Sequence, residues 1–347
     1  MSKRQLLAWH RRIGLVCALF LVLQGLTGAV LAWRAPMERL LAPELRLTPS
    51  PRPALLLERQ IELARTAAPG AVLLRATWPE DDSTAPRFLF DADGHFFMLA
   101  LDSRSGVVLR KGGLARWPVE FALRLHANLI AGSIGHFLVG LDGAALAILV
   151  ALGWRLWWPG RKRLHKGLTI VHGAGTERFL RSLHRSAGSI GAFLLLCASV
   201  TGTVLCWLPQ VQPRFNSEDT LAPEATLDMA LKSWSSRHDH ARPARFIFER
   251  DAPEPVRIDW SNPGTAFPIQ TTLRKEPLGV SISAQPSSSR IAGFRQVLLG
   301  LHSGRIIEPL GRLVALAIAS LLVGLSGTGA WIWWRYSRSR GNSRARI

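Results

Sequence analysis

The stretch "AWHRRIGLVCALFLVLQGLTGAVLAWR", residues 8–34, decides the fold, because it is long and apolar enough to cross a membrane as a helix. A second stretch, "SLHRSAGSIGAFLLLCASVTGTVLCWL", residues 182–208, has the same plan. Each stretch has a His-Arg pair near its start, a Thr-Gly pair within its apolar run and a Trp near its end. This self-similarity indicates a membrane protein built from two related parts.

Four windows of the sequence carry almost no charge, although 43 of the 347 residues are Lys or Arg. The first could also be a secretory signal peptide, since it has a basic start and a small-residue end. We favour a membrane anchor, because its apolar run is longer than that of a signal peptide and its twin lies in mid-chain. The second window is short and contains Asp142, so we expect its helix to continue into "RLWW". The four windows are residues 13–33, 137–154, 186–208 and 313–334.

Most of the formal net charge of +19 lies in three short segments. Residues 1–12, 159–185 and 335–347 together hold 16 Lys and Arg residues against one acid. The long segments 34–125 and 209–300 are nearly neutral, with 13 bases and 11 acids in the first and 11 bases and 10 acids in the second. Basic flanks of spans stay in the cytoplasm. We therefore predict that both termini are cytoplasmic, and that the charge reflects topology and attraction to membrane lipid rather than nucleic-acid binding.

The predicted architecture is an α-helical membrane protein with four transmembrane helices, arranged as two parallel, duplicated two-helix repeats, and two small α+β domains outside the membrane. Its predicted parts are an N-terminus with the first span (1–33), an outside domain (34–125), the second span (126–158), a basic loop (159–185), the third span (186–208), a second outside domain (209–300), the fourth span (301–334) and a basic tail (335–347).

The duplication is seen in offsets that are nearly constant along the chain. A shift of 174 residues places the first span on the third, and a shift of 176 places the second on the fourth. Both copies begin in the cytoplasm, so their symmetry axis is expected along the membrane normal. Matched residues are then expected at equal depth on opposite sides of that axis. The matched pairs include His10 and His184, Gly14 and Gly188, Thr27 and Thr201, Gly28 and Gly202, His126 and His302, Gly135 and Gly311, and Gly153 and Gly329.

The two outside segments are predicted to be small α+β modules. In the first, residues 53–70 have helical spacing and end at Gly70. Residues 87–113 follow as short β-rich runs separated by an Asp93-Gly94 turn and by a turn at 102–106. The second segment repeats the order of helix and then strand, but Pro and Ser interrupt its strand pattern.

These residues resemble a known family. "DADGHFFMLALDSRSGVVL" (91–109) is similar to the hairpin of a PepSY domain, and "LRLHANLIAGSIGHFLVGLDGAALAILVALGWRLWWPG" (123–160) is similar to the core of the PepSY-associated transmembrane family. That family includes bacterial inner-membrane iron-uptake proteins and ferrisiderophore reductases. The resemblance implies a multi-pass protein of the bacterial inner membrane, b-type haems held by histidines, and electron delivery to ferric siderophores in the periplasm. The family is functionally mixed, so membership alone does not establish an activity.

The matched histidines are candidate haem ligands. A low-spin b-haem needs two neutral imidazoles on opposite faces of one porphyrin, and a two-fold related pair such as His10 and His184 supplies them. A single histidine at such a position is more often a hydrogen-bonded residue of the membrane interface than a haem ligand, and it is the matched pair that favours ligation. Gly14 and Gly188 lie one turn beyond this pair and are expected to leave room for a flat macrocycle.

His126 and His302 form the second candidate pair, which brings the expected content to about two haems. His126 precedes its uncharged window by 11 residues, so it can belong to an interfacial helix. His136 lies closer to the membrane and remains an alternative ligand, although its counterpart is Arg312. Haems at the two extreme interfaces would be about 35 Å apart along a helix, so they would have to lie further inward for fast transfer.

The sequence leaves two classes of function open. The first is a di-haem electron carrier that reduces ferric siderophores, with electrons from quinol or from a cytoplasmic or membrane reductase, alongside periplasmic iron-uptake proteins. The second is a non-redox scaffold whose PepSY-like domains bind a periplasmic partner or protease. No nucleotide-binding, zinc or Ser-His-Asp pattern is visible, and the absence of C-x-x-C-H excludes covalent c-type haem. Asp142 within a span is a functional candidate by default, with Arg312 as a possible partner.

Overall fold

The chain alternates between two compact units in the computed structural model. Residues 1–34, 122–209 and 297–347 form one unit, called here the helical unit, and residues 35–121 and 210–296 form the other, the sheet unit. Parts of the predicted segments 1–33, 34–125, 209–300 and 335–347 lie outside the residues that the structure describes. The structure describes residues 2–79, 83–208, 224–238, 240–249, 255–261, 269–277, 279–284 and 290–344.

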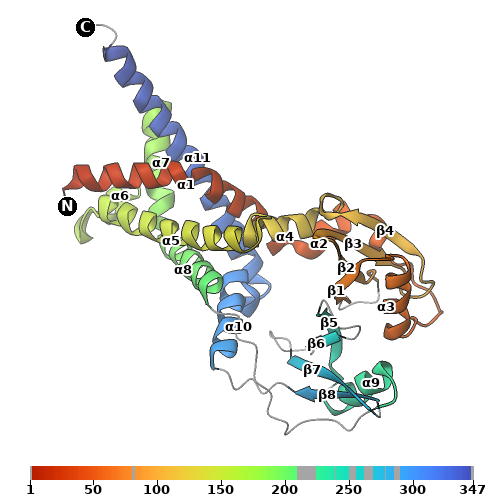
Figure 1. Ribbon diagram of the computed structural model, residues 1–347. Helices are drawn as coiled ribbons and strands as arrows, with labels where there is room; N and C mark the ends of the chain where they lie inside the picture. The colour runs from red at the N-terminus through yellow and green to blue at the C-terminus, as the bar shows by residue number, and fades with distance from the viewer. Residues whose placement is uncertain are drawn as a thin grey trace. The chain divides into compact units, whose positions relative to one another are not determined.

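Long apolar helices build the helical unit (Figure 1). Within the described residues, three helices are long and apolar enough to cross a membrane, or four if the bent pair α7–α8 counts as one span. The chain is therefore a membrane protein with several apolar helices, as the sequence predicted. These helices are α1 (Lys3–Ala32), α5 (Gly132–Trp157), α7 (Thr176–Ile190) with α8 (Ala192–Trp207), and α11 (Leu310–Arg344).

The helices of this unit pack through small and apolar side chains. α1 packs against α11 and α5, and α5 packs in turn against α8. Leucines from four helices meet at the centre, where Leu21, Leu149, Leu195 and Leu322 are buried. Gly25 allows α1 to approach α11, because an added Cβ would lie 3.0 Å from the Ala319 carbonyl oxygen. Small residues at such crossings are typical of helices that associate in lipid.

The third predicted span, 186–208, differs most from expectation, because it is not one straight helix. α7 begins at Thr176, ten residues before the predicted start, and meets α8 at Gly191 with a bend of 63°. A Cβ at Gly191 would collide with the Leu321 side chain of α11. The bend thus falls where a glycine brings the backbone into contact with a neighbouring leucine.

Two short helices precede the second and fourth apolar helices. α4 (Pro118–Asn128) carries His126, and α10 (Arg290–Ser303) carries His302. α4 ends at Asn128, and the next two residues, Leu129 and Ile130, have positive φ angles of 51° and 57°. A Cβ at Gly135 would overlap the Asn128 carbonyl oxygen, and one at the matched Gly311 would overlap that of Gly304. These glycines let each apolar helix begin directly against the preceding turn.

The sheet unit contains one antiparallel sheet of eight strands, in the order β4-β3-β2-β1-β5-β6-β7-β8. The two outside segments therefore do not fold as separate modules; their first strands pair at the centre, with Ala76 opposite Phe246. Asp93 and Gly94 have the positive φ angles of a tight hairpin between β2 and β3. The strands are β1 (Val72–Thr77), β2 (Arg87–Ala92), β3 (His95–Leu101), β4 (Val108–Gly113), β5 (Arg242–Phe248), β6 (Pro255–Ser261), β7 (Ile269–Glu276) and β8 (Gly279–Ala284).

One helix from each segment covers a face of this sheet. α3 (Leu57–Thr66) and α9 (Leu227–Arg237) contact each other, and their buried side chains share one core with Phe88, Phe246 and Trp260. Asp228 at the start of α9 accepts hydrogen bonds from the backbone N–H groups of Leu57 and Glu58. The remaining short elements are α2 (Arg34–Leu41), α6 (Leu164–Gly167) and the 3₁₀ helices η1 (Pro43–Leu45), η2 (Leu114–Arg116), η3 (Arg161–Arg163) and η5 (Arg305–Ile307).

Candidate functional site

The structure brings the four matched histidines together as two pairs. His10 of α1 faces His184 of α7 with ring centroids 6.3 Å apart and ring planes at 86°. His126 of α4 faces His302 of α10 with centroids 6.1 Å apart and planes at 49°. All four residues are partly buried, which leaves part of each ring uncovered by protein. We call these the first pair and the second pair.

Each imidazole lies against a glycine of the neighbouring helix. An added Cβ would lie only 3.0 to 3.4 Å from the Cε1 atom of the facing histidine at all four places. These glycines therefore make room for the imidazole rings themselves. The glycines and their histidines are Gly153 with His10, Gly329 with His184, Gly28 with His126, and Gly202 with His302.

Gly14 and Gly188 lie beside leucine side chains of neighbouring helices, and the room predicted there for a macrocycle stays a prediction. A Cβ at Gly14 would make ordinary contact with Leu149, at 3.6 Å, and a Cβ at Gly188 would contact the matched Leu325 at the same distance. Neither glycine contacts a histidine ring within the described residues. In this structure both lie at leucine-lined helix crossings.

Threonine hydroxyl groups hold three of the four imidazoles. The Nδ1 atoms of His126, His302 and His184 lie 3.0, 3.1 and 2.9 Å from the hydroxyl oxygens of Thr27, Thr201 and Thr328 respectively. Each hydroxyl also lies 2.6 to 2.7 Å from the carbonyl oxygen four residues earlier in its own helix.

These distances favour one tautomer of the three histidines. A hydroxyl has one proton to donate, and the short contact to the backbone carbonyl favours its use there. The threonine oxygen would then accept from Nδ1–H, which leaves the lone pair of Nε2 for another partner. An imidazole with Nδ1–H held by a neighbour and Nε2 free is the form that binds a metal.

His10 is the exception among the four. The residue at the position of the threonine is Leu152, which precedes Gly153 as Thr328 precedes Gly329. The Nδ1 atom of His10 is buried and has no hydrogen-bond partner among the described residues.

The two pairs fit the axial ligands of a haem. Two metal–nitrogen bonds of about 2 Å each, with about 1 Å from each nitrogen to its ring centre, place the centroids about 6 Å apart. Among the described residues no group of three or more His, Cys, Asp or Glu side chains gathers as a bare metal ion would require. A haem iron needs only two side chains, because the porphyrin supplies the other four nitrogens.

His136 lies apart from this arrangement. Its Nδ1 is 2.9 Å from the carbonyl oxygen of Ala127, so the ring bridges the turn between α4 and α5. Its counterpart Arg312 forms an ion pair with Glu308 at 2.9 Å. Among the described residues no imidazole ring pairs with that of His136, and its contact with Ala127 anchors the turn between α4 and α5.

Asp142 is buried in α5 beside the thiol of Cys17 in α1. Its Oδ1 atom has no hydrogen-bond partner among the described residues. Arg312, which the sequence suggested as a partner, contacts Glu308 instead. The residues matched to Asp142 and Cys17 are Ile318 and Gly191, so this polar contact occurs in only one half of the chain.

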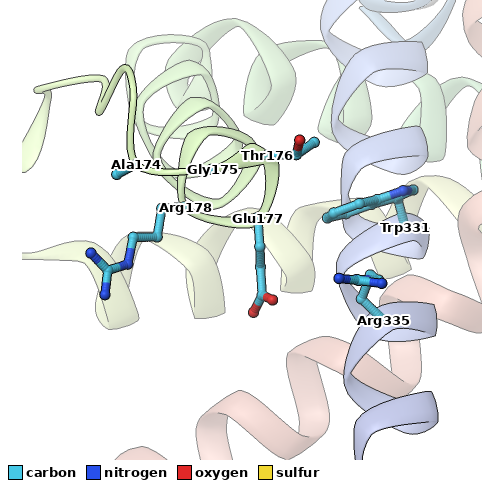
Figure 2. A pocket seen from close by; sticks show the side chains of 7 residues that line it. All are labelled: Ala174, Gly175, Thr176, Glu177, Arg178, Trp331 and Arg335. Carbon is cyan, nitrogen blue, oxygen red and sulfur yellow. The ribbon is translucent and has the colours of Figure 1, made fainter.

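A separate pocket of about 570 Å³ lies between the start of α7 and the end of α11. Figure 2 shows Trp331 and Arg335 on α11 across from Thr176 and Glu177 on α7. None of the four paired histidines lines this pocket. It is thus distinct from both pairs.

Sequence reasoning missed the threonine contacts. Thr27 and Thr201 were recognised only as matched positions, and Thr328 was not singled out at all. The signal was available, because "TG" occurs at 27–28, 201–202 and 328–329, each time opposite a histidine, whereas the fourth position reads "LG" at 152–153.

Comparison with known proteins agrees with the membrane architecture. No curated protein matches the chain significantly. A family model described as "PepSY-associated TM region" matches residues 7–335, which covers nearly the whole sequence and both histidine pairs. The chain therefore belongs to the PepSY-associated transmembrane family.

Proposed function

We propose that the protein is a di-haem electron carrier of the bacterial inner membrane that reduces ferric siderophores to release ferrous iron in the periplasm. The observation that carries the proposal is the pairing of imidazoles about 6 Å apart, three of them with Nδ1 within hydrogen-bond distance of a threonine hydroxyl. Four such side chains at two levels of one bundle have no use in a purely structural scaffold.

The proposed duplication explains why the sites come in pairs. Each pair takes one histidine from each half of the chain, and each histidine contacts a glycine of its own half. The sheet order is likewise symmetric about the β1–β5 contact, with four strands from each half. An axis along the membrane normal relates such parallel repeats and would pass between the members of each pair.

The two pairs lie at different depths of the proposed membrane domain. His126 contacts Thr27, which is 17 residues beyond His10 in α1, a rise of about 26 Å. The charge of the basic segments supports a cytoplasmic position for the first pair and a periplasmic position for the second. This separation is shorter than the full length of α1, as electron transfer between two haems requires.

When bound, each haem would carry one electron between its ferric and ferrous states. The histidines would hold the haem iron, and the threonines and glycines would fix the orientation of the imidazole rings. The first pair would receive electrons from quinol or from a reductase, and the second would pass them to the ferric chelate outside. The siderophore as acceptor rests on the resemblance to ferrisiderophore reductases, and the chemistry of the paired imidazoles supports the redox role.

An optical spectrum of the purified full-length protein tests the proposal. We expect bis-imidazole b-haem bands after reduction with dithionite, with about two haems per chain. His184→Ala should remove one haem and His302→Ala the other, whereas His136→Ala should retain both. Colourless protein from haem-replete cells would overturn the proposal and leave the scaffold function.

The reductase step needs its own assay. Dithionite-reduced protein should be reoxidised by a ferric siderophore, with one Fe²⁺ formed for each ferrous haem consumed, as measured with a ferrous chelator. His302→Ala should lose this reaction, because the pair nearest the acceptor is broken. A haem-loaded protein that ferric siderophores do not reoxidise would refute the substrate while leaving the haem sites intact.

A further inference from the structure

We infer that Leu152 tunes the first haem site because it offers His10 no acceptor for Nδ1–H, whereas a threonine hydroxyl oxygen accepts from Nδ1–H of the other three imidazoles. This inference rests on the proposed haem function. Its structural basis is the buried, unpartnered Nδ1 of His10 beside a leucine at the position where the other helices carry threonine.

The helix geometry at Leu152 equals that at the threonine positions. A Cβ built on Gly153 lies 3.4 Å from Cε1 and 3.9 Å from Nδ1 of His10. The corresponding distances are 3.4 and 3.9 Å from Gly28 to His126, and 3.3 and 3.8 Å from Gly329 to His184. The imidazole of His10 is therefore seated like the others, and only the hydroxyl is missing.

Backbone carbonyl groups do not replace that hydroxyl. The Leu149 carbonyl, four residues before Gly153, approaches His10. The carbonyls four residues before the other three glycines, those of Leu325, Gln24 and Ala198, approach the other three histidines in the same way. What distinguishes His10 is thus the side chain at position 152. A threonine there would lie in the interior of α5, where its hydroxyl could donate to the Ile148 carbonyl four residues earlier, as the other three threonines do.

The missing hydrogen bond has a redox consequence. A neighbour that accepts from Nδ1–H makes the imidazole a more basic ligand, and a more basic ligand stabilises ferric iron over ferrous iron. An iron held by His10 and His184 would have one such supported ligand, and an iron held by His126 and His302 would have two. Leu152 therefore favours the ferrous state at the first site, where electrons enter the protein.

A redox titration of haem-loaded Leu152→Thr tests the inference, with optical bands used to follow each haem. We expect the midpoint potential of the first haem to fall and that of the second to stay. A hydrogen bond of ordinary strength corresponds to about a two- to tenfold lower ratio of ferrous to ferric haem at a fixed potential. Leu152→Val, which alters packing without adding a hydroxyl, is the matched control.

Thr328→Val is a second test, which does not depend on whether Leu152→Thr folds. It removes the hydroxyl from His184, so the first haem should become easier to reduce. Equal shifts in Leu152→Thr and Leu152→Val, or a shift confined to the second haem, would overturn the role of Leu152. Absence of haem from the wild-type protein would instead refute the proposed function, which separates the two failures.

Discussion

The two halves of the chain place their histidines alike although their first helices differ. α1 runs without a break through 30 residues, whereas its counterpart is divided into α7 and α8 with a bend of 63°. Both His10 and His184 nevertheless contact a glycine of the neighbouring helix at nearly the same distance, 3.4 and 3.3 Å from a built Cβ. The distance between imidazole and glycine is therefore more similar in the two halves than the shape of the helix that carries the histidine.

The largest expected effect comes from adding a side chain at one of the glycines that contact an imidazole ring. Gly202 has the closest contact of the four, with a built Cβ 3.0 Å from Cε1 of His302. Gly202→Val should displace that imidazole and remove the second haem while the first remains. Haem content per chain and the reduced spectrum measure this loss.

Gly324 provides the control for that substitution. A Cβ at Gly324 in α11 meets no atom within 4 Å, so Gly324→Ala should retain both haems. Retention of two haems in Gly202→Val would show that the glycine is not needed to seat the ring. The same test applied to Gly28→Ala, at 3.4 Å, should give a smaller effect than Gly202→Ala.

The sequence predicted the helical unit better than the sheet unit for physical reasons. Apolar spans are set by the cost of placing polar groups in lipid, so composition alone indicates them. The pairing of β1 with β5 joins strands about 170 residues apart, and nothing in the local pattern of Val72–Thr77 distinguishes one neighbouring strand from another. Two separate modules were therefore expected where one shared sheet is present.

The candidate site was predicted in part for a similar reason. Offsets of 174 and 176 residues identify the matched histidines, because each offset compares equivalent positions of the two halves. The partners of each histidine lie on a different helix, and no offset relates His184 to Thr328. The position matched to Thr328 is Leu152, so the comparison of the two halves did not show this threonine contact.

A moderate effect is expected at the bend that distinguishes the halves. Gly191→Cys introduces the residue that α1 has at the matched position, Cys17, but its Cβ would collide with Leu321. Overpacking of this kind lowers the free energy of unfolding by about 1–3 kcal/mol. Thermal or denaturant unfolding in detergent micelles, followed by the haem absorbance, measures the change.

Gly188→Ala, within α7 and three residues before Gly191, is the control. Its Cβ would make an ordinary contact with Leu325 at 3.6 Å, and replacing a glycine within a helix raises the free energy of unfolding by about 0.5–1 kcal/mol. Unchanged stability of Gly191→Cys beside this control would mean that the contact with Leu321 does not set the bend.

The smallest effect is expected at Asp142, the polar residue that only the first half carries. Its matched residue is Ile318, and its Oδ1 has no hydrogen-bond partner among the described residues. An unpaired buried acceptor costs free energy, so Asp142→Ile should raise the free energy of unfolding by about 1 kcal/mol and keep both haems. Unfolding in micelles and haem content test both parts of this expectation, with Asp142→Asn as the polar control. A slower reduction of the second haem in Asp142→Ile, restored in Asp142→Glu, would contradict a passive role and place the carboxyl group in the transfer between the two pairs.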